Sequence, residues 1–248
     1  DVLDGTREAI DTMARAHLES GTTSLVPTII TAPEETTMAA IESIGEARRG
    51  DTGGADVLGA FLEGPYLSME KRGAHNPDYV RDPDPTEYET FLEHSEDIAM
   101  MAVAPELPGA LDLGRRLAEH DILPAIAHSD ATFEETVAAV EAGYEHVVHL
   151  YSSLSWLKRR IEAGEKTAGI TEATLLLDEL STELIADGHH VPASMMELTK
   201  KAKGVDGICT ITDAISPAGL GPGEYELGGE DIIVEGGVAK KADRSVFA

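Results

Sequence analysis

Leu58-Gly-Ala-Phe-Leu-Glu-Gly-Pro-Tyr66 is an apolar run that ends abruptly in a carboxylate, a glycine and a proline. Its composition is typical of a buried parallel strand, and the Gly-Pro pair predicts a sharp turn directly after Glu63. Glu63 could simply cap the next element or pair with Arg72. The turn favours the other interpretation, in which the Glu63 carboxylate points into a site at the carboxyl end of the strand.

Three later apolar runs also end in a side chain that can bind a metal or move a proton. Ile122–His128 and His146–His149 end in histidine, and Gly207–Asp213 ends in aspartate. Histidine and carboxylate groups are ligands of zinc and similar divalent metals, and barrel enzymes build their sites from the carboxyl ends of several strands. The four strand ends therefore predict a metal-dependent hydrolase on a barrel scaffold.

Each of these later positions also has a simpler structural interpretation. His128 could lie in a surface turn, although the small residues of Ala125-Ile-Ala127 suit a strand that faces a barrel interior. The same argument applies to His149, which follows two valines. Asp213 could be the N-cap of a following helix, because aspartate is favoured there. At the end of the last strand it could instead be a general base that takes a proton from the attacking water and returns it to a leaving amine.

The other histidines carry no spacing that distinguishes them as metal ligands. Three of them are predicted to lie in loops: His75, His189 and His190. Four more are predicted to lie on helix or strand surfaces and to have no role: His17, His94, His120 and His146.

Length and charge bound the class of protein. With 248 residues, of which 42% are hydrophobic, one α/β domain of barrel size is expected. There are 19 basic and 46 acidic residues, so the formal net charge is −27. Such a surface repels phosphate backbones and excludes nucleic acid as a partner. It is typical of a protein adapted to a high-salt cytoplasm, and an ordinary acidic bacterial protein is the alternative.

Cysteine use and hydropathy indicate the compartment. Cys209 is the single cysteine, so no intrachain disulfide can form and a reducing interior is expected. The apolar runs are shorter than the ~20 residues of a membrane span, and the chain does not open with a signal peptide. We therefore expect a cytoplasmic protein without a membrane partner.

The order of elements alternates strands with helices. Helices are predicted over 6–20, 32–49, 86–93, 108–120, 132–142, from about 171, and 192–203. After Pro217 the pattern becomes glycine-rich, with hairpin turns at Gly228-Gly229 and Gly236-Gly237. About seven βα units result, where a closed (β/α)8 TIM-type barrel requires eight. We expect one barrel domain over 1–248, incomplete because it lacks the first strand and the last helix, with 221–247 as a short-stranded hairpin excursion.

Several short motifs then carry a family likeness across nearly the whole chain. They are Gly21-Thr-Thr-Ser24 with Pro27-Thr28, Phe61-Leu-Glu-Gly-Pro65, Gly73-Ala-His-Asn-Pro77, Ala104-Pro-Glu106, Ala127-His-Ser129, His149-Leu-Tyr151, Ala186-Asp-Gly-His-His190, and Thr212-Asp-Ala214 with Pro217-Ala-Gly219. In these motifs and their order, the sequence resembles the N-acetylglucosamine-6-phosphate deacetylases of the amidohydrolase superfamily.

This resemblance implies a fold, a metal and a reaction. The fold would be a (β/α)8 barrel with Glu63, His128 and His149 as ligands of a divalent metal, expected to be zinc, with one or two ions. Asp213 would be the catalytic acid and base. The reaction would remove the N-acetyl group of N-acetylglucosamine 6-phosphate and give acetate and glucosamine 6-phosphate. The family likeness also implies a homodimer.

The same resemblance implies the substrate-binding residues, with two departures from the family pattern. His75 and His190 would contact the sugar phosphate and its hydroxyls. Family members usually continue His-Leu-Tyr with Asn-Ala-Met, whereas this chain has Ser152-Ser153 at that point, so a backbone contact could survive without the side-chain amide. Where the family supplies an arginine for the phosphate, this chain has Arg159 and Arg160 after Lys158.

Two other functions fit parts of the sequence. A barrel deacetylase or amidohydrolase of another N-acyl substrate is one alternative. A non-catalytic protein that only binds a sugar phosphate is the second, and the altered segment over 152–160 motivates it. The four residues that would carry the chemistry are all present, which argues against the second alternative.

Overall fold

The computed structural model describes residues 1–160 and 164–243, and for 158–160 the backbone alone. Its centre is a curled sheet of seven strands in the order β11-β10-β7-β6-β5-β4-β2, and every neighbouring pair is parallel. The strands are β2 (Thr28–Ile29), β4 (Ala60–Glu63), β5 (Ile98–Val103), β6 (Leu123–Ile126), β7 (His146–Val147), β10 (Ser181–Ile185) and β11 (Ile208–Ile211).

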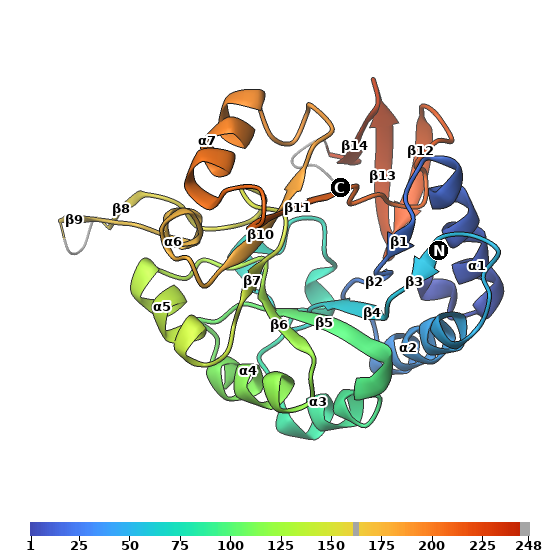
Figure 1. Ribbon diagram of the computed structural model, residues 1–248, viewed down its shortest axis with the longest axis horizontal. Coiled ribbons are helices and arrows are strands. Elements are labelled where there is room, and N and C mark those ends of the chain that lie inside the picture. The colour runs from blue at the N-terminus through green and yellow to red at the C-terminus, as the bar shows by residue number, and fades with distance from the viewer. Residues whose placement is uncertain (161–163, 244–248) are drawn as a thin grey trace.

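The predicted helices are present within one or two residues of their expected ends. They are α1 (Arg7–Glu19), α2 (Glu34–Arg49), α3 (Pro85–Leu92), α4 (Ala110–Glu119), α5 (Phe133–Glu141), α6 (Ile170–Leu176) and α7 (Ala193–Lys203). Helices α2 to α5 lie along the outer side of the curved sheet (Figure 1). Parallel strands inside and connecting helices outside are the arrangement of a TIM-type barrel, and the predicted fold class is confirmed.

Local sequence signals explain where the helices begin. The Thr6 hydroxyl accepts a hydrogen bond from the Ala9 N–H at the start of α1. Thr132 and Glu135 form a reciprocal capping box at the start of α5. Such caps satisfy N–H groups that have no partner inside the helix, and each contributes about 1 kcal/mol.

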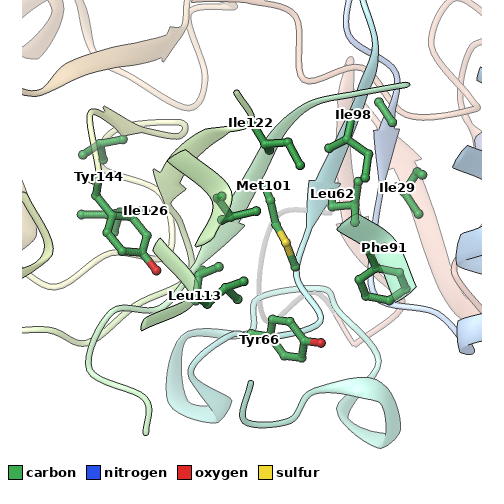
Figure 2. Packing of buried hydrophobic residues seen from close by; sticks show 14 of the residues in the cluster. Ile29, Leu62, Tyr66, Phe91, Ile98, Met101, Leu113, Ile122, Ile126 and Tyr144 are labelled. Carbon is green, nitrogen blue, oxygen red and sulfur yellow. The ribbon is translucent and has the colours of Figure 1, made fainter. Parts of the chain in front are cut away.

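The larger core fills the space between the sheet and the helices. Figure 2 shows labelled members of this cluster, among them Tyr66, Met101, Leu113, Ile126 and Tyr144, all of which are almost fully buried. Burial of each large apolar side chain contributes roughly 1.5–3 kcal/mol. The Tyr144 hydroxyl donates to the Ala110 carbonyl at 2.8 Å, which satisfies the one polar atom of this side chain.

A smaller cluster fills the concave side of the sheet. It consists of Phe61, Met100, Ala102, Ala125, Ala127 and Val148. Successive side chains of a strand point to opposite faces, so Glu63 shares the concave face with Phe61. The alanines occupy little volume, and they leave room above them for polar side chains at the carboxyl ends of the strands.

Shorter elements complete the described chain. They are η1 (Val2–Asp4), η2 (Met69–Lys71), η3 (Pro77–Tyr79), η4 (Ser95–Asp97), and the parallel pair β1 (Ser24–Leu25) and β3 (Asp56–Val57). The strands β8 (Lys158–Arg160) and β9 (Glu165–Thr167) form an antiparallel pair that projects at the left of Figure 1. Across residues 1–160 and 164–243, no helix combines the length and the apolar character that crossing a membrane demands.

The last described segment is a separate antiparallel sheet. Its strands are β12 (Gly223–Leu227), β13 (Glu230–Glu235) and β14 (Val238–Lys241). Both predicted glycine pairs lie in its turns, and all four glycines have positive φ, as tight hairpin turns require. The domain limits predicted from the sequence, a barrel over 1–248 with an excursion over 221–247, remain predictions, and 244–247 lie outside the described residues.

Candidate metal centre and active site

Glu63, His128 and His149 meet at the carboxyl edge of the curled sheet. Nε2 of His128 lies 3.1 Å from Oε1 of Glu63, and Nε2 of His149 lies 2.9 Å from the same oxygen. All three side chains are buried, and their donor atoms lie within 4.8 Å of one another. Three strands thus bring three side chains that could hold a metal ion to one point.

The hydrogen bonds of His128 fix the orientation of its ring. Nδ1 lies 2.8 Å from the main-chain carbonyl oxygen of Lys71, which can only accept, so Nδ1 carries the proton. In the neutral ring, Nε2 then presents a lone pair to the Glu63 carboxylate. A nitrogen lone pair and a carboxylate oxygen repel each other unless a cation or a proton lies between them. A carbonyl that orients the non-ligating nitrogen is typical of metal-binding histidines. The donor set therefore fits a divalent metal ion.

The electrostatics of this cluster agree with that conclusion. Burial opposes ionisation of Glu63, but the hydrogen bonds to His128 and His149 prevail and hold the pKa of this carboxyl well below its usual range. Burial likewise lowers the pKa of His149, but the contact with Glu63 raises it to about 9. In the described residues, Nδ1 of His149 is buried without a hydrogen-bond partner. The site thus concentrates negative charge on Glu63 and attracts a positive charge beside it.

Three of the four predicted chemical residues have a left-handed backbone. The φ angles are 44° at His128, 31° at His149 and 48° at Asp213. Such angles are strained for residues other than glycine and are concentrated at functional sites. Gly73 packs against this cluster, and a Cβ atom there would lie 3.2 Å from Cε1 of His128. The backbone after each strand therefore turns sharply and aims the side chain at the common point.

Asp213 follows β11 at the same edge of the sheet. No helix begins among residues 212–222, so the interpretation of Asp213 as a helix N-cap is wrong. The side chain is reachable from solvent. Desolvation by surrounding protein atoms raises the pKa of its carboxyl, His149 opposes this effect, and the nearby Glu63 carboxylate adds to it. Asp213 thus lies within electrostatic range of Glu63 and His149 and is accessible from solvent.

His75, which its spacing places in a loop and the family resemblance makes a substrate contact, lies next to His128 and Glu63. Its ring centroid is 4.5 Å from that of His128, and its Nε2 is 3.7 Å from Oε2 of Glu63. Nδ1 lies 3.2 Å from the Thr31 hydroxyl. Burial is the main cause that lowers the pKa of His75 to about 3, so the ring is neutral. A neutral imidazole at this place can exchange hydrogen bonds with a molecule bound at the site.

The structure says less about the other predicted substrate-binding residues. Nδ1 of His190 lies 2.7 Å from Oδ2 of Asp187 in the loop after β10. Ser152 and Ser153 directly follow His149-Leu-Tyr151, and the Ser153 carbonyl accepts from the Ser129 N–H at 3.2 Å. Arg159 and Arg160 belong to β8, and their side chains lie outside the described part of the structure. The roles of all these residues remain predictions.

Sequence reasoning missed a buried pair behind His149. His146 was expected on a strand surface, and this expectation is wrong. The side chain is buried, and its Nε2 lies 3.2 Å from Oε1 of Glu183, which is buried as well. The one available signal was a glutamate inside the short strand Ser181–Ile185, where a charge needs a partner.

A second missed residue anchors the turn after His128. The Glu106 carboxylate accepts hydrogen bonds from the Ser129 hydroxyl and the Asp130 N–H, both at 2.6 Å. Burial raises the pKa of Glu106 in spite of these bonds. Glu106 thus fixes the two residues that directly follow His128, a candidate metal ligand.

Fold and site together define the class of protein. The amidohydrolase family model matches residues 3–222, and the chain belongs to the amidohydrolase family. Among curated proteins, it is 38% identical over 244 residues to N-acetylgalactosamine-6-phosphate deacetylase of Escherichia coli O157:H7, which covers 98% of this chain and 63% of that protein. It is 35% identical over 239 residues to N-acetylglucosamine-6-phosphate deacetylase of Vibrio furnissii, covering 96% of this chain and 58% of that protein.

Solved structures agree with the sequence comparison. A mutant of N-acetyl-D-glucosamine-6-phosphate deacetylase from Mycobacterium smegmatis, in complex with N-acetyl-D-glucosamine-6-phosphate, superposes with a TM-score of 0.89 at 30% identity. This match covers 100% of this chain and 63% of that one. The enzyme of the same name from Thermotoga maritima gives 0.86 at 32% identity and covers 96% and 62%. The chain thus spans about three fifths of the length of these relatives.

Proposed function

We propose that this protein is a metal-dependent deacetylase of amino sugar phosphates, with N-acetylglucosamine 6-phosphate as the substrate. The observation that carries the proposal is the convergence of Glu63, His128 and His149 on one point, with Asp213 at the same edge of the sheet. The named activities of the relatives support the substrate class.

The chemistry divides between the metal and the chain. Glu63, His128 and His149 would hold the metal, which when bound supplies Lewis-acid polarisation of the amide carbonyl and of water. Asp213 would accept a proton as the water oxygen bonds to the acetyl carbon. It would then deliver that proton to the sugar nitrogen as the carbon–nitrogen bond breaks. The products would be acetate and glucosamine 6-phosphate.

The substrate contacts follow from the residues around the site. His75 and His190 would contact the sugar phosphate and its hydroxyls, and the backbone of Ser152 and Ser153 would line the pocket beside them. Arg159 and Arg160 would bind the phosphate, for which a guanidinium group is well suited. This set includes a cationic partner for the one charged group of the substrate.

We also propose zinc as the metal, with one or two ions, and a cytoplasmic homodimer. Nitrogen and carboxylate ligands suit zinc. The net charge of −27 favours a high-salt cytoplasm and opposes binding to nucleic acid or to anionic membrane surfaces.

N-acetylgalactosamine 6-phosphate is a second candidate substrate, because one relative at 38% identity is named for the deacetylation of this compound. The two sugars differ only in the configuration at carbon 4. An N-acyl substrate of another kind is the broader alternative.

Acetate release from purified, zinc-loaded protein would test these proposals. The panel is N-acetylglucosamine 6-phosphate, N-acetylgalactosamine 6-phosphate and unphosphorylated N-acetylglucosamine, with chelator-treated protein as the control. We expect release from a phosphorylated sugar, loss of activity in the control, and recovery when zinc is restored. Binding of the sugar phosphates without acetate release, in protein shown to contain metal, would contradict the proposal and favour the non-catalytic alternative.

A further inference from the structure

Glu183 and His146 form a buried polar pair on the neighbouring strands β10 and β7. Oε1 of Glu183 lies 3.2 Å from Nε2 of His146, and both residues are buried, with 8% of Glu183 and 7% of His146 exposed. The pair continues to Ser181, whose hydroxyl lies 2.8 Å from Nδ1 of His146 and donates to the Glu145 carbonyl. Ionisable groups are costly to bury in a barrel interior, so a pair of this kind calls for an explanation.

The second carboxylate oxygen of Glu183 contacts the candidate metal ligand His149. Oε2 accepts a hydrogen bond from the main-chain N–H of His149 at 3.1 Å. The main-chain carbonyl of Glu183 accepts from the next N–H, that of Leu150, at 3.0 Å. One residue thus holds two consecutive N–H groups, one through its side chain and the other through its backbone.

These two hydrogen bonds lie just beyond the end of the regular β7 strand. The pairing of β7 with β10 ends at Val147, and two residues later His149 has a left-handed φ of 31°. A strained conformation persists only when its surroundings over-determine it. The direction of the His149 side chain follows from its backbone, so whatever holds this backbone also directs Nε2 toward Glu63.

We propose that Glu183, braced by His146, is a positioning residue of the metal centre that fixes His149 as a ligand. This inference builds on the metal centre of the proposed function and does not depend on the substrate. Residues that orient metal ligands without contacting the metal typically contribute a factor of about 10–100 to metal affinity.

Metal titration of two variants tests the proposal. Glu183→Leu keeps much of the side-chain volume but removes the acceptor, and we expect about 10- to 100-fold weaker Zn²⁺ binding in competition with a chelator. Glu183→Gln keeps an oxygen for the His149 N–H and an N–H₂ group for His146, and we expect nearly wild-type affinity. The visible absorption of bound Co²⁺ reports ligand geometry, so its bands should shift in the Leu variant and stay in the Gln variant.

Thr182→Val is the matched control. The Thr182 hydroxyl is fully buried and donates to the Val147 carbonyl at 2.9 Å, across the same two strands but without contact to His149. The substitution should lower the melting temperature and leave the Zn²⁺ affinity and the Co²⁺ spectrum unchanged. If it weakened Zn²⁺ binding as much as Glu183→Leu does, the role of Glu183 would be merely structural and the proposal would be overturned.

Glu183→Asp covers the case in which the Leu variant does not fold. It keeps the charge but withdraws the carboxylate by one methylene, so it cannot reach both His149 and His146. We expect several-fold weaker Zn²⁺ binding, and wild-type affinity in this variant would overturn the proposal. Wild-type protein that binds Zn²⁺ tightly but releases no acetate would contradict only the proposed function. Wild-type protein that binds neither Zn²⁺ nor Co²⁺ would overturn both.

Discussion

Nε2 of His149 lies 2.9 Å from Oε1 of Glu63, although 86 positions separate the two residues in the chain. The curled sheet causes this proximity, because β4 and β7 run parallel and end at the same edge, with β5 and β6 between them. A contact between residues so far apart forms only when the intervening strands are paired in register. The candidate metal centre therefore depends on the pairing of the four strands from β4 to β7.

Removal of any one ligand should lower the bound metal. Glu63→Gln, His128→Ala and His149→Ala each delete one of three donors, and we expect clearly less metal per chain after equilibration with limiting zinc. Elemental analysis of the purified variants measures this quantity. His120→Ala is the matched control, because within residues 1–160 and 164–243 the ring of His120 hydrogen-bonds only to the Arg116 carbonyl of the preceding helix and lies outside the site. Full metal occupancy in all three variants would contradict the assignment of Glu63, His128 and His149 as metal ligands.

Asp213→Asn should separate folding from catalysis. An amide cannot accept a proton from water at neutral pH, so we expect kcat to fall by orders of magnitude with little change in KM. The melting temperature and the bound metal should stay near the wild-type values. A folded, metal-replete Asn variant that releases acetate at nearly the wild-type rate would require a different base.

Metal binding should release a proton near pH 8. The pKa of His149 in the metal-free protein is raised from 6.5 to about 9 by Glu63, against the effect of burial. The ring thus keeps its proton at pH 8 and must lose it to coordinate a metal. The stability that this interaction contributes is complete below pH 6.5 and is lost as the pH rises through about 9.

Calorimetry of zinc binding in buffers with different ionisation enthalpies counts the protons released. We expect about one proton from His149 at pH 8 and none above about pH 10. The count should be unchanged in His120→Ala. A heat of binding that is independent of the buffer at pH 8 would contradict the assignment of a protonated His149.

Salt should stabilise the fold. With a formal net charge of −27, like charges repel across the surface, and this repulsion is screened beyond about 3 Å in 1 M salt. We expect the melting temperature to rise from millimolar to molar sodium chloride. A flat profile would disprove the adaptation to high salt. Potassium chloride as a parallel series should give the same rise, because screening depends on ionic strength and not on the cation.

Much of the fold could be predicted from local sequence. The helix from Phe133 to Glu141 was predictable because Thr132 and Glu135 form a cap and Gly143 ends the pattern. The buried strand before Glu63 was predictable because apolar residues and a Gly-Pro turn occur together. Signals of this kind lie within a few residues of the element that they determine.

Contacts between distant segments could not be predicted in the same way. His146 follows a glutamate and precedes two valines, and nothing nearby indicates that its partner is Glu183 on the next strand of the sheet. His75 lies in a long loop, and only the folded chain brings it to the ring of His128. The left-handed angles were also unpredicted, because the residues involved are not glycines.

Those left-handed angles imply a conflict between two kinds of selection. Backbone strain at His128, His149 and Asp213 costs about 1–3 kcal/mol at each position, and glycine would remove it. At the buried His128 and His149, the loss of the contacts with Glu63 outweighs this gain. At Asp213, whose side chain is exposed, a glycine is expected to raise the free energy of unfolding of the metal-free protein while it deletes the proposed base. A library of variants that is selected only for heat resistance should accumulate glycine at position 213 and lose acetate release, whereas a library that is selected for acetate release should keep Asp213 and its strain.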